Sequence, residues 1–293
     1  MAAAQWSELR SAVYSRVAAR GFGAAVVRLA WTDASSFGNN TNNTTNTNTT
    51  NSGGAHAQNV ALKGSPQPQR RRPSHTPLLS ADDNGLGEAV ALLAPLAQSY
   101  ALSTADLWSF AAAVVVANSG GPSIKWRPGR ADAVDALDAP FPVFGGTSPV
   151  RLKPDFTAKD IRNAFANRMG FTDRETVALM GAHSMGIAKL NNTGYSGAWT
   201  LTPSYLSNQY FVQLSLNTTY NLQSITALDN STKTQYVNSR GLMLLPSDMA
   251  LTQDASYLAI VQEYATDQTL FLNDFGSAFT KLLELGLPPP ATA

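Results

Sequence analysis

Apolar residues recur at intervals of three and four along most of this chain, which is the spacing of an amphipathic α-helix. Clusters of glycine and proline separate the periodic segments, and no run of alternating apolar and polar residues predicts a set of strands. The predicted helices cover residues 6–20, 23–37, 84–100, 104–119, 203–214, 255–264 and 268–285. We therefore expect an all-α fold with many short connections.

Two helix starts carry a capping signal. Ser103 is followed three residues later by Asp106, and Thr172 is followed at the same spacing by Glu175. The hydroxyl of such a residue accepts a hydrogen bond from the backbone of the first turn. The second signal precedes an apolar run that ends at His183 and predicts a further helix there.

One long segment does not fit the helical pattern. Residues 39–54 are almost entirely Asn and Thr, and residues 65–77 are rich in proline and include the basic triplet Arg70–Arg72. Such segments cannot bury a core, so we expect residues 39–77 to be a disordered insertion within one domain spanning residues 1–293. We interpret the triplet as a solvated loop.

Composition limits the classes of function. The 293 residues carry 21 basic and 20 acidic side chains, a balance that gives no support for nucleic acid or a membrane surface as a partner. The absence of cysteine excludes disulfides and a thiolate metal ligand. No stretch of about 18 apolar residues predicts a transmembrane helix. We expect an intracellular protein, and a removed N-terminal targeting or anchor segment stays open.

Few residues could supply an imidazole, because the only histidines are His56, His75 and His183. His183 follows an apolar helix and has small neighbours that would let a flat group approach. Elsewhere, Arg28 lies one helical turn before Trp31 and Thr32, so the three share a face. Taken alone, a lone histidine is more often a core residue, and an Arg–Trp pair is as often a surface contact.

Taken together and in order, these segments resemble the class I haem peroxidases, the family of cytochrome c peroxidase and ascorbate peroxidase. The resemblance runs from about residue 24 to residue 287, apart from the insertion. It is carried by Arg28-x-x-Trp31, Gly181-x-His183-x-x-Gly186, Trp199 sixteen residues after the histidine, and Leu245-Pro246-Ser247-Asp248. The resemblance implies a two-lobed fold that holds a b-type haem between a distal and a proximal helix.

The proximal residues of the family all have counterparts here. By resemblance, His183 is the axial iron ligand through Nε2, and Asp248 is the carboxylate on its Nδ1. Such a pair increases imidazole basicity and lowers the iron potential. Trp199 corresponds to the tryptophan that stacks on the histidine. Lys189 corresponds to a basic residue near a haem propionate, although a solvated lysine at a helix end fits equally well.

The distal side departs from the family. Arg28 and Trp31 correspond to the distal arginine and tryptophan, but Thr32 stands where the family has its proton-accepting histidine. Loss of a general base typically lowers the rate by about 10²–10⁴-fold. Asp83 replaces the asparagine that orients that histidine. Asp83 is either a substitute base or a charge partner of Arg28, and we favour the second interpretation because a nearby arginine weakens a carboxylate base.

The donor and cation sites also differ. Asn192 stands where ascorbate peroxidases carry an arginine, which argues against an ascorbate site and leaves a cytochrome c-like reductant as the candidate partner. Ser184, Thr200 and Thr202 supply oxygens of the family's proximal cation site, but Ser207 replaces its aspartate. Without that carboxylate we do not expect a tightly bound potassium or calcium ion.

These departures leave three hypotheses for function. The first is a haem-binding pseudoperoxidase with little turnover of hydrogen peroxide, similar to those of trypanosomatid protists, which reacts with peroxynitrite or related species under oxidative stress. The second is an active peroxidase that uses Asp83 as its distal base. The third is a non-enzymatic haem sensor or interaction protein, in which His56 or His75 could block the distal side.

Overall fold

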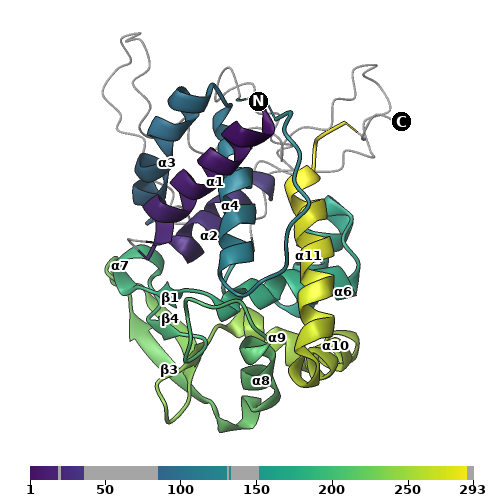
Figure 1. Cartoon of the computed structure of the whole chain (residues 1–293). Coiled ribbons are helices and arrows are strands. Elements are labelled where there is room, and N and C mark those ends of the chain that lie inside the picture. Colours follow the sequence, from purple (N-terminus) through teal and green to yellow (C-terminus); the bar gives the residue numbers. More distant parts are fainter. Residues whose placement is uncertain (19–20, 36–84, 131, 133–151, 289–293) are drawn as a thin grey trace, which may run out of the picture.

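The computed structural model describes residues 1–18, 21–35, 85–130, 132 and 152–288. The predicted insertion and Asp83 lie outside these ranges. Within them the chain is mostly helical (Figure 1), which confirms the predicted class. The longer helices are α1 (Ala3–Ala18), α2 (Gly23–Ala34), α3 (Gly87–Tyr100), α4 (Thr104–Asn118), α6 (Asp173–Met180), α9 (Pro246–Gln253), α10 (Ala255–Thr266) and α11 (Gln268–Glu284). The shorter ones are α5 (Ala158–Arg162), α7 (Leu190–Thr193) and α8 (Gln209–Ser215).

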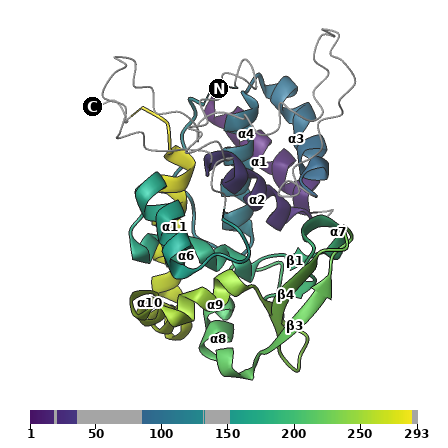
Figure 2. The ribbon, with the colours of Figure 1, turned by 180° about the vertical axis from the view of Figure 1, so that it is seen from behind.

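Helices α1 to α4 pack together in one half of the molecule, and α6 and α8 to α11 form most of the other half (Figures 1 and 2). Helix α4 is the centre of the first half, because the run from Ala105 to Val116 is buried on every side. The helix begins where the sequence predicts, since the Ser103 hydroxyl accepts a hydrogen bond from the Asp106 N–H at 3.0 Å. A helix that is apolar all round must be enclosed by its neighbours.

The second half contains a small antiparallel sheet that the sequence did not predict. Strands β3 (Asn221–Thr226), β4 (Thr232–Val237) and β5 (Met243–Leu244) pair in that order, with Leu222 opposite Tyr236. A two-residue pair, β1 (Ile187–Ala188) with β2 (Gly197–Ala198), lies beside the site described below. Strand β3 is exposed at nearly every position, so it lacks the alternation that identifies a half-buried strand.

Two segments near the site also differ from the predictions. The helix expected over residues 203–214 begins only at Gln209, because residues 203–208 form turns. The Leu-Pro-Ser-Asp segment, which lies outside the predicted helices, caps and begins α9, with Pro246 as the first helical residue. The capping box at Thr172 and Glu175 is present as predicted and begins α6.

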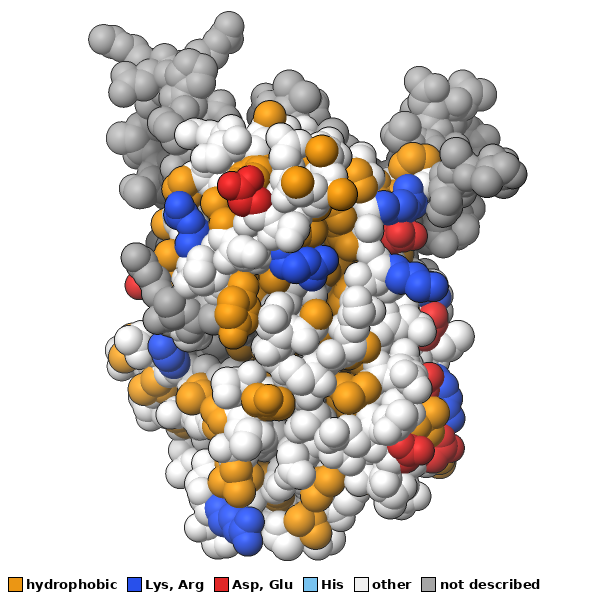
Figure 3. Space-filling view, in the orientation of Figure 1, with side chains coloured by type: hydrophobic (Ala, Val, Ile, Leu, Met, Phe, Trp, Pro, Cys, Tyr) orange, Lys and Arg blue, Asp and Glu red, His pale blue; other side chains and the backbone are white. Residues whose placement is uncertain are grey.

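An arginine joins three helices at the edge of the second half. Arg162, the last residue of α5, donates two hydrogen bonds to Asp173 of α6 and two to Asp254, which caps α10. These hydrogen bonds lower the pKa of both carboxyl groups below their ordinary values. Figure 3 shows acidic and basic side chains side by side along the edge where α6, α10 and α11 lie.

We expect Arg162→Met to lower the free energy of unfolding at pH 7 by roughly 1 kcal/mol, the upper range for partly exposed pairs. Because Asp173 and Asp254 have lowered pKa values in the folded state, their contribution is complete at neutral pH and disappears as the pH falls through those values. The variant should therefore lose less stability than the wild type between pH 7 and pH 3. Urea unfolding at several pH values measures both effects. Arg240→Met, at an exposed residue, is the control, and an equal change in that variant would contradict the prediction.

In the part of the chain that the structure describes, no single helix has the length and apolarity to cross a membrane. Only α3 and α4 taken together meet those criteria, and they are bent by 114° at their junction.

Candidate haem site

A tight turn after α6 presents His183. The chain leaves the α-helix at Met180 and forms a single 3-10 turn, Gly181–Ser184. Gly181 permits this turn to pack closely, because a Cβ there would lie 2.5 Å from the ring of Phe271. The imidazole of His183 stacks on the indole of Trp199, with ring centroids 4.7 Å apart and planes inclined by 22°. The family resemblance implies this pair, and the structure brings the two rings together.

The fully buried carboxylate of Asp248 lies at the centre of a hydrogen-bond network. Its Oδ1 accepts from His183 Nδ1 at 2.8 Å and from the Tyr210 hydroxyl at 2.7 Å. Its Oδ2 accepts from Trp199 Nε1 at 2.8 Å and from the Leu245 N–H at 2.7 Å. The carboxylate therefore fixes the tautomer and orientation of His183, since Nδ1 must carry the proton that it donates.

The charges of this network follow from burial and hydrogen bonding. Burial alone would raise the pKa of Asp248, but the His183 imidazole and the hydrogen bonds from His183, Leu245 and Tyr210 lower it below its ordinary value. Burial, with the negative charge of Asp248, raises the pKa of Tyr210 well above 10. The aspartate is thus ionised and the phenol keeps its proton.

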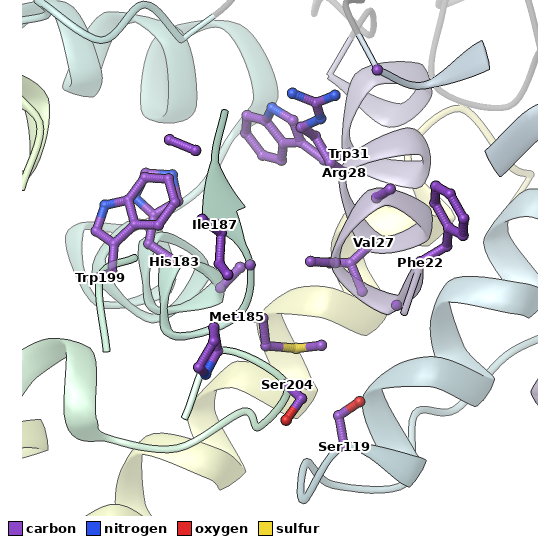
Figure 4. Close-up of a pocket in the computed structure, with 18 of the residues that line it drawn as sticks. Phe22, Val27, Arg28, Trp31, Ser119, His183, Met185, Ile187, Trp199 and Ser204 are labelled. Carbon is purple, nitrogen blue, oxygen red and sulfur yellow. The ribbon is translucent and has the colours of Figure 1, made fainter. Parts of the chain in front are cut away.

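Arg28 and Trp31 extend from α2 on the opposite side of a cavity from His183 and Trp199 (Figure 4). Trp31 stacks on Phe165, with ring centroids 5.1 Å apart and planes inclined by 28°, and both side chains line the cavity. Phe165 lies in a π-helical turn, Asn163–Asn167, and is almost fully buried. Nothing in the sequence singled out Phe165 or Tyr210. Tyr210 lies in a predicted helix of ordinary apolar pattern, and no prediction covered the segment of Phe165.

The cavity between these two groups has a volume of about 730 Å³, within the range of about 300–1,000 Å³ typical of cofactor pockets. Small residues line it on both sides and leave room for a flat molecule: Gly23, Ala24, Ala25, Ala182 and Gly186. Gly186 has a φ of +95°, and a Cβ there would lie 2.9 Å from the Cβ of Ala24. Within the described residues, no hydrogen bond engages His183 Nε2, so this nitrogen is available as a ligand. The residues present therefore fit a haem.

Of the other residues predicted for the site, some line the cavity and others do not. Lys189 and Asn192 line the cavity, and Lys189 is exposed to solvent. Thr32 is 6 % exposed and is not among the described residues that line the cavity. Among those residues Glu88, exposed on α3, is the only one with a carboxylate.

Two of the three residues that correspond to the family's cation site make hydrogen bonds within the protein. Ser184 Oγ accepts a hydrogen bond from the Ser207 N–H at 3.3 Å, and Thr200 Oγ1 donates to the Ser184 carbonyl at 2.9 Å. Thr202 is exposed. Across the described ranges, no group of three or more His, Cys, Asp or Glu side chains is placed to hold a metal ion.

Comparison with known proteins agrees with this site. The family described as Peroxidase matches residues 7–267, so the chain belongs to the peroxidase family. This membership confirms the predicted family.

Its relatives include a "Putative heme-binding peroxidase" of Candida albicans, 42 % identical over 205 residues that make up 69 % of this chain and 67 % of that protein. A mitochondrial cytochrome c peroxidase of Candida glabrata is 34 % identical over 271 residues, 92 % of this chain and 66 % of the relative. A mitochondrial cytochrome c peroxidase of Cryptococcus neoformans is 39 % identical over 209 residues, 70 % of this chain and 52 % of the relative. The chain thus spans about half to two thirds of the length of these relatives.

Proposed function

We propose that this chain binds a b-type haem in the 730 Å³ cavity, with His183 Nε2 as the iron ligand, and reacts only weakly with hydrogen peroxide. The observation that carries the proposal is the contrast between the two sides of the cavity. The proximal side has a complete network around Asp248, whereas α2 offers Arg28 and Trp31 and no imidazole. A bound haem would supply the redox-active iron that reacts with the oxidant.

The residues of the chain divide the work between them. His183 would hold the iron, and Asp248, through its hydrogen bond to Nδ1, would keep the imidazole oriented and electron-rich. Arg28 would donate hydrogen bonds to an oxidant in the cavity, and Trp31 would contact a bound haem. We propose that Lys189, at the mouth of the cavity, pairs with a propionate. We propose that Trp199, which stacks on His183, passes an electron to the site from a cytochrome c-like reductant.

The two residues that α2 contributes to the distal side, Arg28 and Trp31, favour a different oxidant. Hydrogen peroxide must lose a proton to the protein before its O–O bond breaks, and neither Arg28 nor Trp31 can accept one. Peroxynitrite has a weaker O–O bond and arrives in part as its neutral acid, so a protein base matters less. We therefore propose peroxynitrite breakdown as the reaction that this site supports better.

Stopped-flow spectroscopy of the ferric, haem-loaded protein tests the proposal. We expect the reaction with hydrogen peroxide to be slower by about 10²–10⁴-fold than in peroxidases with a distal base. The reaction with peroxynitrite should be much the faster of the two. Equal and fast reaction with both oxidants would overturn the pseudoperoxidase assignment.

Two further measurements separate the alternatives. If Asp83 is a working base, Asp83→Asn should abolish the reaction with hydrogen peroxide, and Glu88→Gln, at the one described carboxylate in the cavity, is the matched control. A six-coordinate ferric spectrum before any oxidant is added would support the sensor function. Failure to bind haem at all would contradict all three hypotheses.

A further inference from the structure

Two donors share one oxygen of the Asp248 carboxylate. His183 Nδ1 lies 2.8 Å and the Tyr210 hydroxyl 2.7 Å from Oδ1, while the Trp199 and Leu245 donors both use Oδ2. Oδ1 therefore accepts a hydrogen bond from a second donor besides the histidine. A phenylalanine at position 210 would fill nearly the same volume and leave that oxygen to His183 alone.

The packing around Tyr210 keeps its hydroxyl on Asp248 Oδ1. The residue lies on α8 and is fully buried, and its ring meets the imidazole edge-on with centroids 5.7 Å apart. Phe211 packs against it at 5.1 Å and continues an aromatic cluster with Tyr264 and Phe271. Full burial and these ring contacts hold the phenol beside Asp248, where it donates its hydrogen bond.

Sharing an acceptor weakens each of the bonds that it makes. A donor on Oδ1 withdraws electron density from the carboxylate, and less of the negative charge of Asp248 is then felt by the His183 N–H. The imidazole becomes a poorer electron donor at Nε2. Axial-ligand basicity set by such outer hydrogen bonds is one of the means by which a protein adjusts an iron potential.

We propose that Tyr210 is a positioning residue that limits the charge passed from Asp248 to His183 and so raises the reduction potential of the iron. The proposal rests on the haem-binding function proposed above. Asp248 and Tyr210 then have opposite effects on the iron: the carboxylate stabilises the ferric state, and the phenol reduces that stabilisation. The electron-accepting strength of the site is then set on α8, away from the cavity.

The test is a spectroelectrochemical titration of the haem-loaded wild type and Tyr210→Phe. Loss of the phenol should make the midpoint more negative, so that at fixed applied potential the ferric-to-ferrous ratio rises by roughly three- to tenfold, tenfold being about 59 mV for one electron. The matched control is Tyr220→Phe, because the buried Tyr220 hydroxyl donates to Gln213 at 3.0 Å and not to Asp248. That variant should keep the wild-type midpoint.

A second substitution reverses the sign of the effect. Site-specific 3,5-difluorotyrosine at position 210 is a stronger donor than tyrosine and should shift the midpoint positive, which also covers the case in which Tyr210→Phe does not fold. An unchanged midpoint in either folded, haem-loaded variant overturns the role of Tyr210 and leaves haem binding standing. Failure of the wild type to bind haem overturns both.

Discussion

A histidine placed at position 32 is expected to raise the second-order rate constant for the reaction of the haem-loaded protein with hydrogen peroxide by about 10²–10⁴-fold. Thr32 lies directly after Trp31 and one helical turn after Arg28 on α2. A threonine hydroxyl stays protonated near neutral pH and cannot act as a base. A histidine side chain is longer, so its imidazole can extend toward the cavity that Thr32 itself does not line.

A control variant separates the effect of the basicity of the new side chain at position 32 from the effect of its size. Thr32→Gln introduces a side chain of similar length that is not a base, and it should keep the wild-type rate. Because Thr32 is 6 % exposed, either substitution is expected to reduce stability by about 1–3 kcal/mol through overpacking, so circular dichroism and the haem absorption band should accompany the kinetics. A wild type that already reacts as fast as Thr32→His would show that another group supplies the proton transfer.

Asp248→Ala is expected to lower the free energy of unfolding by about 3–5 kcal/mol, the range for breaking a buried charge network from one side. Four donors lose their acceptor together: the side chains of His183, Trp199 and Tyr210 and the backbone of Leu245. A buried donor without a partner typically costs about 1–3 kcal/mol, and water entering the space recovers part of that.

Chemical denaturation of the haem-free protein measures this effect apart from haem affinity. Asp267→Ala is the control, because Asp267 also caps a helix, through the Leu270 N–H at 2.9 Å, but at an exposed position. That change should reduce stability by only about 1 kcal/mol. Similar losses in the two variants would mean that the network around Asp248 contributes no more than an ordinary cap.

Local signals in the sequence located most of the helices correctly. Ser103 and Thr172 mark helix starts because the hydroxyl and the N–H that it caps lie within one turn of each other. Strand β3 gave no such signal. Its side chains are almost all exposed, and its existence depends on pairing with β4 through a turn at residues 227–231.

In the candidate site, too, some features could be predicted from the sequence and others only from the packing. Residue order and spacing identified His183, Trp199 and Asp248, and the structure brings all three into contact. Helical spacing also placed Thr32 on the face of Arg28, but spacing does not tell how far along a helix a cavity extends. Only the packing of α2 shows that Thr32 lies outside the cavity lining.

The sequence by itself determined the family and the helical class, and it predicted that His183, Trp199 and Asp248 belong to one site. These conclusions depend on local patterns and on motifs in a fixed order. Only the tertiary structure shows that Tyr210 and His183 donate to the same oxygen of Asp248 and that Phe165 stacks on Trp31. Both contacts join helices far apart in the chain, and each side chain reads as an ordinary core residue in its own segment. Their roles arise from packing between elements, which the order of residues does not record.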